Sequence, residues 1–435
     1  MPDDSTPESG SPGPAGGSNP PPNPTPEAAG AGAVAPTVLS RKELRKQKGS
    51  PRSWFFALGG VGVLIVAAVV ALVITSKSTP SSASKPPATV TPITALPTTT
   101  TAPAPTCPLT GTPAPGGTVP ARPALGVKIG NYPDDRPSAG LNQADVVFEE
   151  PVEGGITRLV AVFQCQSPAL VGDLRSARQP DVGILSQLSK PIFVHAGGID
   201  PVIALLQAAP LTDENLQSGA PAAAVIQQPG RYAPYADFAN TAALWALDPS
   251  DTTPPAPIFT YTPAPPAGSV AGSGGSVHIP FSGTSDVTWT WNPPADNYLR
   301  SYATGPDKLI DGSQSAANNV VIMTVQTSNG PWLENDVGGL EVQIPNTGSG
   351  PLVVLRNGVA ITGTWTRTSL TQPPTLTATD GTPITLQPGN TWEELVPSGI
   401  AVTTAPGPAT ALPAAPTTTT STTVPAKTAA KDTAK

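Results

Sequence analysis

The longest hydrophobic run of the chain covers residues 54–75 and reads WFFALGGVGVLIVAAVVALVIT. It holds no charged residue, and as an α-helix it would extend roughly 33 Å, which is enough to cross the hydrocarbon of a bilayer. Six basic residues lie between positions 41 and 52, whereas only two lysines lie between this run and Arg122. The pattern predicts one transmembrane helix with the N-terminus in the cytoplasm and the remainder outside.

A cleaved signal peptide is the alternative interpretation of this run. Signal peptides have an apolar core of roughly 7–15 residues close to the N-terminus, whereas here 53 residues precede a longer core. We therefore expect a permanent anchor, which makes the chain a single-pass protein of the cell membrane with its folded part extracytoplasmic.

Short apolar runs separated by Gly and Pro begin at Ala124 and predict a first half that mixes strands and helices. Pro180 suits the first turn of a helix, and Asp200 suits the N-cap of another. The strands are expected at residues 124–130, 144–150, 157–164, 169–174 and 191–197, and the helices at 180–189, 201–209 and 236–247.

The second half alternates hydrophobic and polar residues in the manner of a sheet with one solvated face. Asn357-Gly358 lies between two such runs and predicts a type I′ hairpin turn, because both central residues of that turn need a positive φ. Trp289 and Trp291 share one face of their run, so they belong either to the core or to an exposed platform. Strands are expected at residues 277–283, 287–292, 318–327, 351–358 and 360–368.

These patterns predict an α+β fold, with a mixed α/β first half and a mainly β second half. Long stretches rich in Pro, Thr, Ser and Ala cannot bury enough apolar surface to offset the entropy of ordering, and they predict tails and linkers. The expected organisation is a disordered cytoplasmic tail (1–53), the transmembrane helix (54–75), a linker (76–117), the first half (118–248), a connector (249–276), the second half (277–402) and a disordered tail (403–435).

Charge and composition exclude several classes of function. The net charge is -7 and basic residues are scarce outside the cluster before residue 54, so a nucleic-acid surface is not expected. Two Cys and two His in 435 residues do not indicate a zinc module, and no calcium-loop spacing occurs, so neither a metal nor a cofactor is predicted. Outside the membrane, Cys107 and Cys165 are expected to form a disulfide. The alternative is a thiol nucleophile, with Cys165 activated by His195.

Longer motifs in both halves resemble a known family. The first half contains ALGVKIGNYPDDRPSAGLNQADVVFEEPVEGGITRLVAVFQ, GDLRSAR and FVHAGG, and the second contains YLRSYATGPDKLIDGSQSAANNVVIM, GTWTR and LQPGNTWEELVP. Together they resemble the YerB-like family of extracytoplasmic bacterial lipoproteins, a domain of unknown function, over residues 107–400. The resemblance implies a two-part α and β domain in the cell envelope. Many relatives are anchored through a lipidated Cys, whereas here no Cys follows the apolar run until Cys107.

The densest set of polar residues lies between Asn131 and His195 and predicts an anion-binding site. Guanidinium groups match carboxylate or phosphate oxygens in pairs, and Gly154 and Gly155 allow backbone N–H groups to approach. An anionic cell-wall ligand or a carboxylate of an envelope protein is the expected partner. The alternative, which is the commoner arrangement in proteins, is that these charges pair with one another and hold loops. The candidate residues are Arg136, Arg158, Arg175, Arg178, Ser176 and Glu153.

Glu149, Glu150 and Glu153 support a second hypothesis, a cell-wall hydrolase or transferase that uses a carboxylate pair. Adjacent residues of a strand point to opposite faces, so Glu149 and Glu150 cannot both serve one site from a regular strand. The sequence therefore favours a binding or scaffolding protein over an enzyme.

Overall fold

The computed structural model describes residues 104–334 and 339–414. The predicted cytoplasmic tail, the transmembrane helix at residues 54–75 and most of the linker fall outside this range, as does the end of the chain. Within the described residues, none of the helices is both long and apolar enough to cross a membrane.

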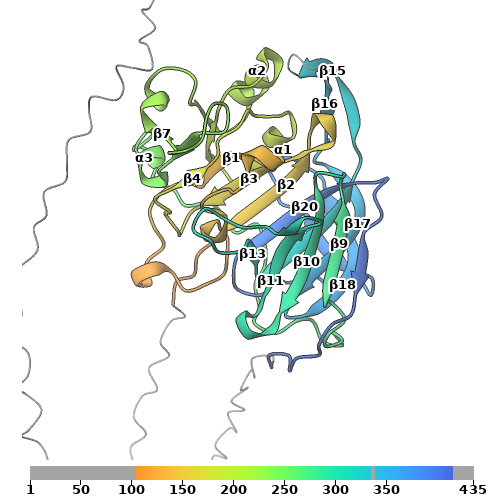
Figure 1. Ribbon diagram of the computed structural model, residues 1–435. Coiled ribbons are helices and arrows are strands. Elements are labelled where there is room, and N and C mark those ends of the chain that lie inside the picture. The colour runs from red at the N-terminus through yellow and green to blue at the C-terminus, as the bar shows by residue number, and fades with distance from the viewer. Residues whose placement is uncertain (1–103, 335–338, 415–435) are drawn as a thin grey trace, which may run out of the picture. The chain divides into compact units, whose positions relative to one another are not determined.

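One large mixed sheet runs through the described residues in the order β19-β18-β17-β14-β20-β2-β3-β1-β5-β6 (Figure 1). Strand β20 lies between β14 and β2 and is parallel to both, with Val146 opposite Thr391 and Glu149 opposite Glu394. The two halves therefore share one sheet. Its strands are β1 (Leu125–Gly130), β2 (Val146–Pro151), β3 (Thr157–Phe163), β5 (Ile192–His195), β6 (Thr212–Asn215), β14 (Asn319–Val325), β17 (Gly348–Arg356), β18 (Val359–Arg367), β19 (Thr375–Ala378) and β20 (Thr391–Pro397).

A second sheet covers one face of the large sheet and comes from the second half of the chain (Figure 1). Strand β10 alternates buried and more exposed residues, and Trp289 packs edge-on against Trp392 with 5.1 Å between ring centroids. Trp289 is 0% and Trp291 6% exposed, so these rings belong to the core and the platform hypothesis is wrong. The strands are β9 (Ser276–Pro280), β10 (Asp286–Asn292), β11 (Asn297–Tyr302), β12 (Gly305–Pro306), β13 (Ala316–Ala317) and β21 (Thr403–Ala405).

Helices α1 (Pro180–Ser186) and α2 (Asp200–Ala208) cover the opposite face of the large sheet. They bury Leu185 and Leu206 against strand residues such as Phe193, and Phe259 of the connector packs on the same side. Because both faces are covered, the central strands β1, β2, β3, β14 and β20 are buried along almost their whole length. Continuous apolar runs, rather than strict alternation, are the expected sequence signature of such strands.

The remaining elements are small. They include a short sheet with its helix, a two-stranded hairpin and single turns of 3₁₀-helix. They are β4 (Val171–Gly172), β7 (Val225–Gln227), β8 (Asp237–Ala239), α3 (Thr241–Trp245), β15 (Ser328–Glu334), β16 (Gly339–Gln343), η2 (Pro115–Gly117), η3 (Pro133–Asp135), η4 (Leu141–Gln143), η5 (Glu153–Gly155), η6 (Ala220–Ala224) and η7 (Pro293–Ala295).

Two local predictions differ from the structure. The helix expected at residues 236–247 is strand β8 followed by α3, because the Asn240 side chain accepts hydrogen bonds from the N–H groups of Ala242 and Ala243 and so starts the helix there. Asp200 is the first helical residue of α2, and Ile199 is its N-cap. The turn at Asn357-Gly358 is confirmed, with φ of 46° and 71° between β17 and β18.

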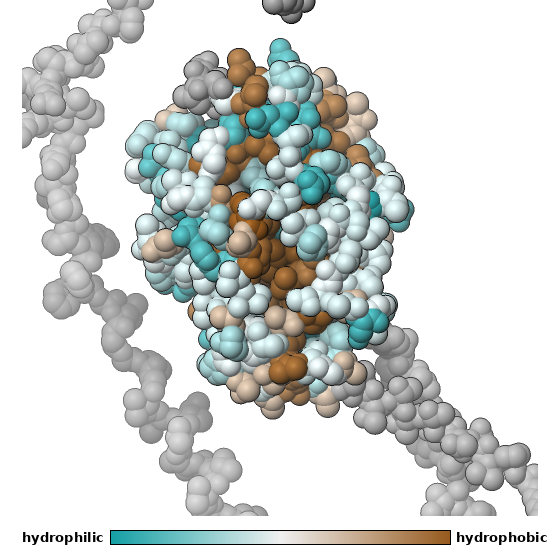
Figure 2. All heavy atoms as spheres, turned by 90° about the vertical axis from the view of Figure 1, so that its right-hand side faces the viewer, coloured by the Kyte–Doolittle hydropathy of each residue, from teal (hydrophilic) through white to brown (hydrophobic). Residues whose placement is uncertain are grey.

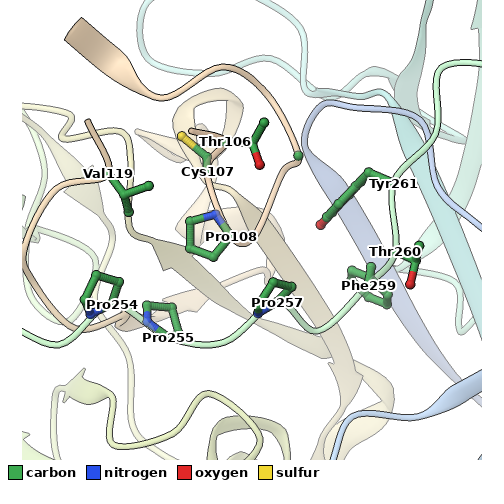
Figure 3. Close-up of a pocket in the computed structure, with 11 residues that line it drawn as sticks. Thr106, Cys107, Pro108, Val119, Pro254, Pro255, Pro257, Phe259, Thr260 and Tyr261 are labelled. Carbon is green, nitrogen blue, oxygen red and sulfur yellow. The ribbon is translucent and has the colours of Figure 1, made fainter. Parts of the chain in front are cut away.

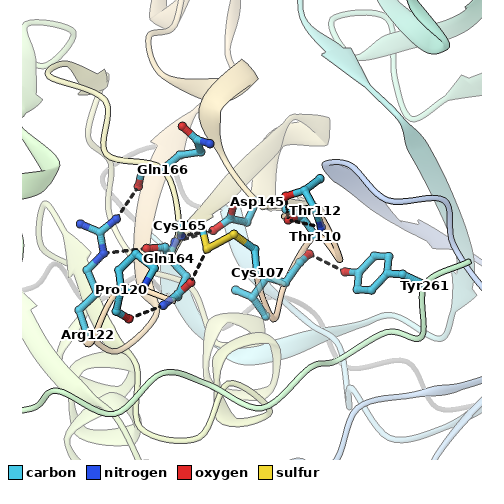
Figure 4. Close-up of a disulfide and its surroundings, with 11 residues drawn as sticks. Cys107, Thr110, Thr112, Pro120, Arg122, Asp145, Gln164, Cys165, Gln166 and Tyr261 are labelled. Carbon is cyan, nitrogen blue, oxygen red and sulfur yellow. Dashed lines mark hydrogen bonds between the residues drawn. A yellow bond between two sulfur atoms is a disulfide. The ribbon is translucent and has the colours of Figure 1, made fainter. Parts of the chain in front are cut away.

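The predicted disulfide between Cys107 and Cys165 is present, with 6.0 Å between the Cα atoms (Figure 4). Around it, the N–H groups of Gln164 and Cys165 donate to the buried carboxylate of Asp145, and the Tyr261 hydroxyl donates to the carbonyl of Leu109. Cys107 and Leu109 are buried, so the segment before the first strand packs on the domain and is not a free linker there.

Candidate functional site

A pocket of about 410 Å³ opens beside the start of β3, and we call it the Arg158 pocket. It contains four ionisable side chains that carry charge and two tyrosine rings, around a small apolar floor. Its lining residues are Tyr132, Asp135, Glu153, Gly154, Ile156, Arg158, Arg175, Tyr235 and Gly339. The walls therefore come from η3, η5, β3, the segment after β4, the loop before β8 and the start of β16.

Glycines determine how closely these walls approach. A Cβ atom at Gly130 would lie 2.4 Å from Cγ of Asp135 and 2.8 Å from Cγ of Arg175, so only glycine leaves room for this pair. In η5, Gly154 has a φ of 76°, a conformation that L side chains rarely adopt. The pocket depends on backbone positions that a larger residue would disturb.

Arg175 forms one side of the pocket and is neutralised by Asp135. Its Nε donates to Oδ1 of Asp135 at 2.8 Å, its Nη2 donates to the same oxygen, and its guanidinium lies 4.6 Å from the ring centroid of Tyr235. Behind this pair, burial and the charge of Asp135 raise the pKa of Asp173 to about 9. Asp173 is therefore protonated at neutral pH.

Arg178 lies behind the pocket and is neutralised by Glu153. Its Nε donates to Oε2 of Glu153 at 2.8 Å and its Nη2 donates to Oε1, which is the paired geometry of strong guanidinium–carboxylate contacts. Burial acts to raise the pKa of Glu153, but the hydrogen bond and charge of Arg178 outweigh it and hold that pKa below its usual value. Glu334 of β15 also lies 3.1 Å from Arg178, and burial raises its pKa to about 7.

Arg158 differs from these two arginines because its ion pair with a carboxylate, that of Glu153, is too long for a hydrogen bond. Its Nη1 donates to the carbonyl of Ser176 at 2.8 Å, and its Nη2 lies 3.9 Å from Glu153, beyond hydrogen-bond distance. Its side chain is 13% exposed. Burial, followed by the repulsion of Arg178, lowers the pKa of Arg158 to about 10, so it remains charged at neutral pH. Its remaining N–H groups are the least satisfied cationic donors of the pocket.

The other two predicted residues do not line the pocket. Arg136 donates to the carbonyls of Asn131 and Thr284, and its guanidinium lies 3.4 Å from the ring centroid of Tyr302. The hydroxyl of Ser176 donates to the carbonyl of Ala196. Both hold loops together through backbone carbonyls, a role different from the mutual charge pairing that the sequence left open as the alternative.

Glu149 and Glu150 point to opposite faces of β2, as the strand geometry predicted. Glu149 accepts from Arg300 at 2.6 Å on the side of the second sheet. Glu150 accepts from Lys128, which also donates to Asp181 at 2.7 Å on the side of α1. All three charged side chains of this second cluster are fully buried. These carboxylates therefore do not form a pair in one accessible site.

Tyr132, Tyr235 and Asp135 line the pocket but were not predicted from the sequence as site residues. Tyr132 directly precedes Pro133, and a residue before proline is held in the extended region, which projects this side chain from the turn. Tyr235 has no comparable local signal, because its place depends on the stacking with Arg175.

A larger cavity of about 640 Å³ lies next to the disulfide, between the N-terminal segment and the connector (Figure 3). Cys107, Pro108, Pro257, Phe259 and Tyr261 are among its lining residues. Apart from the tyrosine hydroxyl and two threonines, its side chains are apolar, and no charged group lines it among the described residues. It offers contact area but little that would orient a polar ligand.

Hydrophobic residues also reach the surface as a band down one face of the molecule (Figure 2). Separately, Leu333 and Leu340, which are cross-strand neighbours in the β15–β16 hairpin, are largely exposed. Single exposed apolar residues are common on protein surfaces. We assign neither feature a ligand.

Comparison with known proteins places the chain in a family. The model "Protein of unknown function (DUF3048) N-terminal domain" matches residues 109–253, and the corresponding C-terminal domain matches residues 277–392. The chain is 47% identical over 79 residues to "Putative lipoprotein YerB" of Bacillus subtilis (strain 168), which covers 18% of this chain and only 24% of that relative.

The crystal structure of the YerB protein from Bacillus subtilis has a TM-score of 0.58 and 22% sequence identity to this chain, and the match covers 68% of this chain and 99% of that one. At this identity the likeness concerns the fold. Together with the two family models, it confirms the resemblance seen in the sequence motifs. The chain belongs to the YerB-like family of unknown function, whose N-terminal and C-terminal domains it carries in order.

Proposed function

We propose that this chain is a membrane-associated protein of the bacterial cell envelope that binds a carboxylate of a cell-wall ligand or of a partner protein in the Arg158 pocket. The charge balance of the pocket carries this proposal. Asp135 is hydrogen-bonded to Arg175 and Glu153 to Arg178, whereas Arg158 has only a 3.9 Å ion pair with Glu153, whose carboxylate it shares with Arg178. A largely buried cation with so weak an ion pair is costly, so an incoming anion gains more there than at an arginine that is hydrogen-bonded to its own carboxylate.

The location rests on three observations of different kinds. The YerB relative is described as a lipoprotein, which is a membrane-associated class. In this chain the hydrophobic run at residues 54–75, with basic residues before it, supports a single-pass anchor with the described domain outside the cytoplasm. A disulfide between Cys107 and Cys165 suits that oxidising side.

Binding is a better account of the geometry than hydrolysis. A glycosidase needs two carboxyl groups that flank one substrate bond at roughly 5–9 Å. Glu149 and Glu150 lie on opposite faces of β2, both fully buried against cations, and Glu153 is held by Arg178. These contacts support a pocket that recognises charge rather than one that cleaves a bond.

Crosslinking in intact cells tests the proposal. The full chain would carry a photoreactive residue at the pocket rim, in the wild type, in Arg158→Gln and in Lys190→Gln. Lys190 is an exposed cation outside the pocket, so its replacement matches the change in charge. We expect one captured species that Arg158→Gln loses and Lys190→Gln keeps. Identical captured material in all three, with unchanged thermal stability, would refute carboxylate binding at Arg158.

A further inference from the structure

Exposed aromatic rings gather at the Arg158 pocket. Among the large hydrophobic side chains that are exposed in the described residues, the two aromatic ones are Tyr132, at 39%, and Tyr232, at 70%. Tyr132 lines the pocket, and Tyr232 packs edge-on against the pocket residue Tyr235 with 5.7 Å between ring centroids. The tryptophans of β10, in contrast, are buried. The surface aromatic rings thus lie beside Arg158, the arginine of the pocket with the weakest contact to a carboxylate.

Tyrosine rings at a pocket rim offer flat apolar faces with a polar edge. Such faces pack well against the C–H side of a sugar ring, which is apolar in the middle and polar at its rim. The cation stacking of Arg175 on Tyr235 fixes the position of that ring before a ligand arrives. The rim is therefore preorganised for a ring-shaped ligand.

The polar groups of the pocket restrict the ligand further. Asp135 and Glu153 present carboxylate oxygens that accept hydrogen bonds, so a ligand with several negative charges would be repelled. A ligand with an ammonium group would be repelled by Arg158 and Arg175, and by Arg178 behind them. Hydroxyl groups suit both kinds of neighbour, because they donate to carboxylates and accept from guanidinium groups. A ligand with one acidic group and many hydroxyls satisfies all of these constraints.

We infer that the Arg158 pocket binds an acidic saccharide, with one carboxylate at Arg158 and a sugar face on Tyr132 and Tyr235. This inference rests on the proposed carboxylate binding and names its ligand class. The volume of about 410 Å³ lies within the range of roughly 300–1,000 Å³ that is usual for small-molecule sites. A short saccharide therefore fits, while the rest of a glycan strand extends past the tyrosine rim.

Titration of the full chain in detergent with defined saccharides tests this assignment. The probes are galacturonic acid and a disaccharide that contains one N-acetylmuramic acid, each compared with its methyl ester. We expect at least one acid to bind tenfold or more tightly than its ester. Arg158→Gln should remove that difference, whereas Lys190→Gln should retain it.

A matched pair of variants at Tyr132 tests the contact between the tyrosine ring and the sugar face. Tyr132→Ala should weaken binding of the acid several-fold, whereas Tyr132→Phe, which keeps the ring, should bind like the wild type. Equal affinity for acid and ester, an unchanged affinity in Tyr132→Ala, or no binding of either acid would overturn the saccharide assignment. If the crosslink in cells still depends on Arg158 but neither acid competes with it, carboxylate binding stands and the saccharide is wrong.

Discussion

Removal of the bridge between Cys107 and Cys165 gives a quantitative test of how the N-terminal segment is held. The two cysteines are 58 positions apart in the chain. In the chain-entropy model a closed loop of that length stabilises the folded state by about 4 kcal/mol at 25 °C. With an unfolding entropy of roughly 2.1 cal/mol/K per residue over roughly 300 residues, the same free energy corresponds to a fall in Tm of about 6 °C.

Calorimetric unfolding measures this effect. The samples are the wild type and the double variant Cys107→Ser/Cys165→Ser, each with and without a reductant. The reduced wild type and the double variant should unfold at the same temperature, and the reductant should not affect the double variant. Cys165 donates its backbone N–H to Asp145 in either case, so that contact does not contribute to the difference. A loss of less than about 1 kcal/mol would refute the loop-entropy reasoning.

Four further predictions concern buried charge and the pocket walls. Lys128→Met should cost about 3–5 kcal/mol in chemical denaturation, because it leaves the carboxylate of Asp181 buried without its cation. Glu150→Gln should cost under about 1 kcal/mol at pH 7, since burial and the charge of Asp181 raise the pKa of Glu150 to about 8 and the native group is already protonated. Burial raises the pKa of Glu393 to about 7, so the wild type should lose stability as pH rises from about 4.5 to 7. Glu393→Gln should remove that loss, which is about 3 kcal/mol when complete. Equal denaturation midpoints of the wild type and Glu393→Gln at pH 8 would contradict this prediction. Gly130→Ala should abolish Arg158-dependent crosslinking, because the added methyl group would lie 2.4 Å from the pocket's aspartate.

Local patterns predicted much of the fold. Runs such as residues 157–164 and 318–327 are β-branched and apolar, and they form β3 and β14 because each has enough hydrophobic surface to be buried on both faces. The disulfide followed from the number of cysteines and the predicted export. Strand β20 was not predicted, because Glu393 and Glu394 indicate a solvated segment. Their burial depends on distant partners: the indole of Trp289 donates to Glu394.

The candidate site was predicted only in part, for a similar reason. The sequence identified the arginines, but it could not distinguish those that are hydrogen-bonded to carboxylates from the one with only a long ion pair. That difference depends on which loops meet: Arg178 hydrogen-bonds to Glu153, whereas Nη2 of Arg158 lies 3.9 Å from the same carboxylate. Exposure of tyrosine rings is likewise a property of the folded surface, so their gathering at the pocket has no signature in composition or spacing.

The position of β20 determines when this protein is able to fold. Val146 pairs with Thr391, so the ribosome adds about 245 residues between the two partners, which takes roughly 12–50 s at bacterial elongation rates of about 5–20 residues per second. For that time β2 has an open edge in the middle of the future sheet, and unpaired edges recruit other chains. The nascent chain therefore needs a holding factor, or must stay extended, until its last central strand arrives. A chain that ends before residue 391 is expected to aggregate rather than to form a half-domain.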